Sequence, residues 1–97
     1  MRDEILRAYS LIDFMDILQE ECAELICACS KYKRCTGHGF KTEANIIDTV
    51  DNIVEEIADV SICLEQMKHF FKDYKIDEVI EQKMQKFLKE IEEQKKK

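Results

Sequence analysis

Two short acidic segments of this chain repeat one another and hold the residues best suited to chemistry. Residues 20–25 read E-E-C-A-E-L, and residues 55–60 read E-E-I-A-D-V. Each segment places three carboxylates beside apolar residues. Carboxylates gathered in this way repel one another unless a cation lies among them. The repeat therefore indicates a metal site.

The first acidic segment lies in a long helical pattern. Apolar residues recur every three or four positions from about Glu4 to Arg34, with a candidate break near Ser10. Residues 36–41 hold both glycines of the chain and form its one clear loop.

Two more helices follow this loop. One starts near Thr42 or Asn45 and ends near Lys72, and it contains the second acidic segment. The last starts near Asp77, whose side chain is suited to an N-cap, and runs to about Ile91. No strand pattern is present, so the predicted fold class is all-α: an antiparallel helical hairpin plus a third helix.

Helical spacing selects four carboxylates from the two segments. Glu21 and Glu24 are neighbours three residues apart on the first helix, and so are Glu56 and Asp59 on the second. Both pairs border the predicted buried faces, which consist of Leu18, Cys22, Leu25 and Cys29 on the first helix and Ile53, Ile57, Val60 and Leu64 on the second. The pairs are about equally far from the glycine loop, so an antiparallel hairpin brings them level. Glu20 and Glu55 lie further round and are expected to be more exposed.

Four converging carboxylates favour a hard divalent cation, Mg²⁺ or Mn²⁺, because every donor is a carboxylate oxygen. A di-iron site in a helical bundle would need Glu-x-x-His motifs, and neither histidine lies near these residues. The alternative is that each pair is an ordinary solvent-facing pair, as acidic residues on helices usually are.

Composition sets the wider expectations. The chain has 97 residues and is predicted to be one domain over 1–97, with a frayed basic tail at 92–97. A domain of this size gains stability from self-association. The net charge of −6 argues against a nucleic-acid polymer or an anionic membrane as partner. The five cysteines form no C-x-x-C motif, so we expect buried free thiols and a cytoplasmic protein.

The pattern Glu20-Glu21-x-x-Glu24, a gap of about thirty residues, and Glu56-x-x-Asp59 resembles the signature of the MazG-like all-α nucleoside triphosphate pyrophosphohydrolases. The resemblance extends over residues 18–91. It implies hydrolysis of (d)NTPs to (d)NMP and pyrophosphate, in a role such as the removal of non-standard nucleotides. It also implies Mg²⁺ held by Glu21, Glu24, Glu56 and Asp59, with Glu20 orienting or deprotonating water. Such proteins assemble as homodimers or homotetramers with four-helix-type bundles.

The resemblance further implies basic residues that meet the phosphates. Lys83 and Lys86 stand at matching positions of the last helix, and Lys31 is a further candidate on the first. Position 86 carries Lys where Arg is usual, and Glu90 stands where a further Arg is often found. Two other functions remain open: a non-catalytic helical interaction module, and a nucleotide or metal sensor with the same fold.

Overall fold

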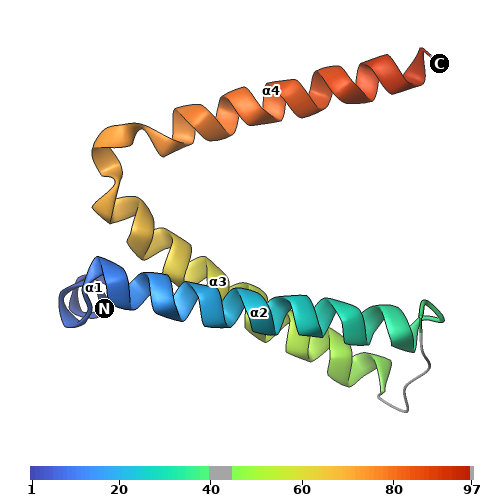
Figure 1. Cartoon of the computed structure of the whole chain (residues 1–97), viewed down its shortest axis with the longest axis horizontal. Coiled ribbons are helices and arrows are strands. Elements are labelled where there is room, and N and C mark those ends of the chain that lie inside the picture. The colour runs from blue at the N-terminus through green and yellow to red at the C-terminus, as the bar shows by residue number, and fades with distance from the viewer. Residues whose placement is uncertain (40–44, 97) are drawn as a thin grey trace. The chain divides into compact units, whose positions relative to one another are not determined.

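The chain is all-helical, as the sequence predicts. A computed structural model describes residues 1–39 and 45–96, and no strand occurs among them. The helices are α1 (Arg2–Ala8), α2 (Leu11–Cys35), α3 (Ile46–Phe70) and α4 (Ile76–Lys95), with a short 3-10 helix, η1, at Lys72–Tyr74. Helices α2 and α3 run side by side in opposite directions (Figure 1).

The predicted break near Ser10 is confirmed and has a clear chemical cause. Tyr9 is extended, which ends α1, and Ser10 is the N-cap of α2. The Ser10 hydroxyl accepts from the Asp13 backbone N–H at 3.1 Å, and the Asp13 carboxylate accepts from the Ser10 N–H at 3.0 Å. This reciprocal capping box satisfies two backbone donors, and the hydrogen bond from the Ser10 backbone lowers the pKa of Asp13.

The turn after α2 needs its two glycines. Gly37 and Gly39 have φ angles of 90° and 81°, which residues with a Cβ rarely adopt. The His38 N–H donates to the Lys33 carbonyl at 2.7 Å and closes the end of the helix. The predicted loop therefore agrees over residues 36–39, while Phe40, Lys41 and Thr42 lie outside the described residues. At the start of α3, Asn45 Oδ1 accepts from the Ile47 N–H at 2.7 Å.

The prediction that Asp77 caps the last helix is wrong. The N-cap of α4 is Lys75, which has a left-handed backbone with φ 52° and ψ 53°. Asp77 lies inside the first turn, where its charge suits the helix dipole. It accepts from Lys68 Nζ at 3.1 Å.

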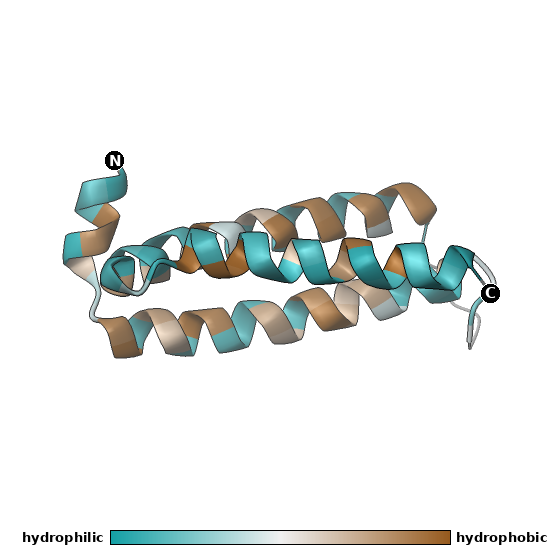
Figure 2. Cartoon of the chain, turned by 90° about the horizontal axis from the view of Figure 1, so that it is seen from above, coloured by the Kyte–Doolittle hydropathy of each residue, from teal (hydrophilic) through white to brown (hydrophobic). Residues whose placement is uncertain are grey.

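The chain divides into two compact units, residues 1–67 and 68–97. In the first unit, the buried apolar side chains of the described residues are Phe14, Ala28 and Cys63, and Thr49, Glu56 and Gln66 are buried polar ones. In the second unit, no described side chain of η1 or α4 is buried. Figure 2 shows hydrophobic residues along much of α2 and α3.

The predicted buried faces are therefore only partly right. Leu18, Cys22 and Leu25 are half-buried, but Cys29 is exposed. Ile57 and Leu64 on α3 retain about half of their surface. Two helices cover only a narrow stripe of each other, and the stripe of α3 follows Thr49, Glu56 and Cys63 instead.

All five cysteines are free, as expected, but only Cys63 is buried. Burial, followed by the charges of Glu21 and Asp59, raises the pKa of its thiol. Among the described residues, no helix has both the length and the apolar character to cross a bilayer.

Replacing Ser10 by Ala should lower the free energy of unfolding by about 1 kcal/mol, because the N-cap hydrogen bond is lost. Urea unfolding followed by circular dichroism measures this. Ser61→Ala, at an exposed position inside α3, is the matched control and should change stability by less than about 0.5 kcal/mol. Equal losses in both variants would contradict the cap.

Candidate metal-binding site

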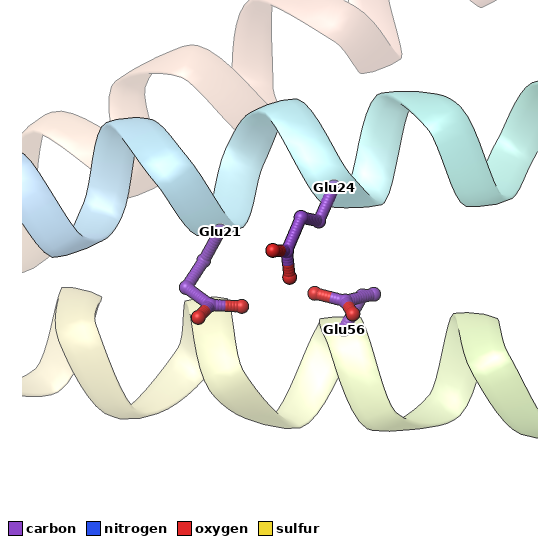
Figure 3. A group of neighbouring side chains, drawn as sticks. All are labelled: Glu21, Glu24 and Glu56. Carbon is purple, nitrogen blue, oxygen red and sulfur yellow. The ribbon is translucent and has the colours of Figure 1, made fainter.

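Three carboxylates meet across the seam between α2 and α3. Glu21 and Glu24 come from α2 and Glu56 comes from α3 (Figure 3). Each offers one oxygen, and these three oxygens lie within 4.8 Å of one another. We call these three residues the carboxylate cluster.

Heptad spacing places two members of the cluster inside the seam. On α2, Glu21 stands seven residues from both Phe14 and Ala28, the two buried residues of that helix. On α3, Glu56 stands seven residues from both Thr49 and Cys63, which are also buried. Residues seven apart share a helix face, so both carboxylates occupy positions that normally pack the core.

Burial differs sharply among the three side chains. Glu56 is only 9% exposed, Glu21 is half-buried and Glu24 is exposed. Glu21 Oε2 and Glu56 Oε2 are each buried without a hydrogen-bond partner. A buried oxygen without a donor is costly, and native structures rarely keep one without a compensating water or ion.

Burial is also the largest influence on how these groups titrate. Burial, followed by the hydrogen bond to Glu56 and the charge of Glu24, raises the pKa of Glu21 to about 7. Burial likewise raises the pKa of Glu56, and the charges of Glu24 and Asp59 add to that rise. The hydrogen bond with Glu21 acts in the opposite direction and lowers the pKa of Glu56, but burial outweighs it.

Among the described residues, no ion pair joins a basic side chain to the cluster. The ion pairs among the described residues join Met1 to Glu4, Arg2 to Glu65 and Lys68 to Asp77. The first two join ends of helices and the third lies at the start of α4. A bound cation or a proton would therefore balance the negative charge of the buried carboxylates.

The structure thus brings together three of the four expected metal ligands. Asp59 is half-buried, and its charge acts on Glu21, Glu56 and Cys63, so it lies nearby. It stands outside the group whose oxygens meet within 4.8 Å. Its side chain is one methylene shorter than that of Glu. Glu20 and Glu55 are exposed, as predicted.

The candidate phosphate-binding lysines lie in different places. Lys31 is exposed on α2 and lines a hollow of about 320 Å³ together with Ala23, Glu24, Cys27 and Asn52. The hollow therefore touches the cluster through Glu24. Lys83 and Lys86 are exposed on α4 in the second unit, around a hollow of about 200 Å³ that Phe87 and Glu90 also line. Their role as phosphate contacts stays a prediction.

Two neighbours of the site were not singled out from the sequence. Asn52 stands one helical turn before Glu56 and faces the hollow with Lys31. Cys63 stands two turns after Glu56 and lies near Glu21 and Asp59. Both follow the spacing of three, four and seven residues from Glu56 that marks one helix face. That spacing was the signal that could have identified them.

Without metal, the thermal stability of the protein should fall as pH rises from about 5 to 8. Glu21 has a pKa of about 7 in the folded chain and an ordinary value of 4.5. The folded state therefore binds more protons in this window, and its stabilisation is lost as pH passes the folded pKa. Calorimetry in the presence of a chelator should show this fall in melting temperature. Addition of Mg²⁺ should raise the melting temperature again near pH 8.

Glu21→Gln should remove most of the pH dependence in the same calorimetric experiment. Glu55→Gln, which changes an exposed carboxylate outside the cluster, should leave it intact. Melting temperatures that do not depend on pH in the wild type would contradict a raised pKa in the seam.

Comparisons of the chain with protein-family models, curated proteins and solved structures found no match. No relative therefore supplies roles for individual residues. The roles proposed below come from the buried carboxylates of α2 and α3, and from the motif spacing described above.

Proposed function

We propose that this chain is a Mg²⁺-dependent nucleoside triphosphate pyrophosphohydrolase of the MazG-like all-α type. Its reaction would be attack of water on the α-phosphorus of a (d)NTP. The bond to the oxygen that bridges the α- and β-phosphorus atoms breaks, and pyrophosphate leaves with that oxygen. The products are a (d)NMP and pyrophosphate. Disposal of non-standard nucleotides in the cytoplasm is the role that we infer for it.

The observation that carries the proposal is the pair of buried carboxylate oxygens without partners, on Glu21 and Glu56. An ordinary solvent-facing pair of glutamates would leave both oxygens in water. Here two helices each direct a carboxylate into their shared seam, where an apolar pair would stabilise the fold better. Ionisable groups with shifted pKa values, at positions where apolar residues would pack better, are typical of a functional site.

The donor set fits Mg²⁺. All three residues of the cluster offer hard oxygens, and Mn²⁺ meets the same requirement. Glu21, Glu24 and Glu56 would hold the ion, and Asp59 would supply a further carboxylate from the same flank of α3. When bound, the cation polarises a phosphoryl oxygen and lowers the pKa of a coordinated water.

Residues around the cluster would bind the phosphates, orient the nucleotide and activate the water. Glu24 is the exposed member and borders the hollow with Lys31 and Asn52. Lys31 would donate to a phosphate oxygen there, and the Asn52 amide would orient the nucleotide. Glu20, exposed one position before Glu21, would orient or deprotonate the attacking water. Phosphoryl transfer needs little beyond positioning and charge stabilisation, so this set suffices chemically.

Charge explains why a cation is central to the proposed reaction. The chain carries a net charge of −6 and its substrate would be a polyanion. The cluster itself would repel phosphate in the absence of metal. A divalent ion would reverse the sign of the field at the point where the phosphates must approach. Lys83 and Lys86 would add positive charge once the chains assemble into a homodimer or homotetramer with a four-helix-type bundle.

Pyrophosphate release from a panel of NTPs and dNTPs tests the proposal. We expect turnover of at least one nucleotide with Mg²⁺ and none with a chelator. Glu56→Gln should lower kcat/KM by about 100-fold or more, because metal-ion charge stabilisation is worth several kcal/mol and each 1.36 kcal/mol is a factor of ten.

The matched control is Glu55→Gln, which changes the exposed glutamate next to Glu56 on the same helix and should keep wild-type turnover. Absence of release from every nucleotide would contradict the enzyme. In that case, Mg²⁺-dependent nucleotide binding by calorimetry would favour a sensor, and no binding at all would favour a helical interaction module.

A further inference from the structure

A hollow with basic side chains lies at the C-terminal end of α2, further along the helix than the carboxylate cluster. Its volume is about 450 Å³. None of the described residues that line it is acidic, whereas the hollows beside Lys31 and Lys83 each include a glutamate. In a chain of net charge −6, this hollow is therefore locally electropositive. Its lining residues are Ser30, Lys33, Arg34, His38 and Gly39.

The end of the helix and the glycine turn bring these residues together. Lys33 and Arg34 follow Ser30 by three and four residues, so they are its neighbours on the helix surface. The chain then folds back, and the His38 N–H donates to the Lys33 carbonyl at 2.7 Å. A Cβ placed on Gly39 would lie 3.8 Å from Arg34 Cγ, so the turn lies against the Arg34 side chain.

Basic residues at a helix C-terminus often serve only to neutralise its last carbonyls, but here the turn supplies the donors. The Thr36 N–H and hydroxyl both donate to the carbonyls of Tyr32 and Lys33, at 3.1 to 3.2 Å. The Gly37 N–H donates to the Arg34 carbonyl at 3.4 Å. Neither Lys33 nor Arg34 takes part in the ion pairs found within residues 1–39 and 45–96. Their charges are therefore available to a ligand.

The donors around the hollow suit phosphate groups. The Arg34 guanidinium is a planar fork that matches two phosphate oxygens, and the Lys33 ammonium adds a second positive charge. The Ser30 hydroxyl is a further donor. Nδ1 of His38 lies 3.4 Å from Thr36 Oγ1, which leaves Nε2 as the ring nitrogen that can meet a ligand. A volume of about 450 Å³ is in the range of small-molecule sites and has room for several phosphate groups.

We propose that this hollow binds the phosphate chain of a small polyphosphate, either free or as the tail of a nucleotide. It needs no metal ion, because Lys33 and Arg34 supply the positive charge. The hollow shares no lining residue with the one beside Glu24. The carboxylate cluster repels phosphate when no cation is bound, so binding in a chelator reports this hollow alone. The inference therefore stands or fails separately from the proposed enzymatic reaction.

Isothermal titration calorimetry with sodium tripolyphosphate, in a chelator and at low salt, tests the proposal. We expect saturable binding, with similar affinity for ATP and none for adenosine, because the phosphate chain is the group that is recognised. Lys33→Gln and Arg34→Gln should each weaken binding by about tenfold, the usual effect of losing a hydrogen bond to a charged group. Both side chains are exposed, so circular dichroism of the variants should match the wild type.

The matched control is Lys89→Gln, which removes the same charge at an exposed position of α4 and should bind tripolyphosphate like the wild type. The proposal is overturned if the wild type does not bind tripolyphosphate, or if all three variants lose affinity equally, as a nonspecific charge effect would give. It is also overturned if binding requires Mg²⁺ and disappears in Glu56→Gln, because the phosphates would then occupy the carboxylate cluster.

Discussion

The structure depends on two carboxylates, Glu21 and Glu56, that meet inside the seam between α2 and α3. Their buried oxygens have no hydrogen-bond partner, and burial raises the pKa of both groups. A seam built this way is unfavourable when both groups are ionised, so its stability depends on a proton or a cation. This dependence links fold to function, because Glu21 and Glu56 are proposed metal ligands and their charge state also determines the stability of the contact between α2 and α3.

The presence of polar and acidic residues at core positions also explains why so much apolar surface remains exposed. Core positions of α3 are given to Thr49, Glu56 and Gln66, and only Phe14, Ala28 and Cys63 are buried apolar residues among those described. Ile57 and Leu64 stay about half exposed. A small domain with so modest a core gains stability by burying such surface against further copies. The proposed association between copies and the proposed metal binding would both compensate for this small core.

The elements that obey local rules could be predicted from the sequence. The Ser10 break, the glycine turn at residues 36–39 and the antiparallel hairpin follow from capping, positive φ and periodicity. Spacing of three residues within each helix, with the equal distance of both pairs from the glycine loop, also identified Glu21, Glu24 and Glu56 as neighbours. Two predictions failed, the helix phase and one cap. Periodicity favoured Ile57 and Cys29 as core residues, and the residue type of Asp77 favoured it as an N-cap. The seam runs through Glu56, because two packed helices cover a narrower stripe than the apolar pattern spans. The N-cap is Lys75, whose left-handed backbone starts the helix two residues before Asp77. Asp59 stands outside the cluster, although periodicity places it beside Glu56, because periodicity does not encode how far a side chain reaches across the seam.

Titration of the protein with Mn²⁺, followed by the electron paramagnetic resonance signal of the free ion, tests the central claim most directly. The account predicts saturable binding above pH 7, where Glu21 is ionised, with Mg²⁺ competing for the same site. It predicts that Glu21→Gln and Glu56→Gln, which keep the size of the side chain, both abolish this binding. Mn²⁺ binding of equal strength in the wild type and both variants, or no binding in the wild type, would contradict it.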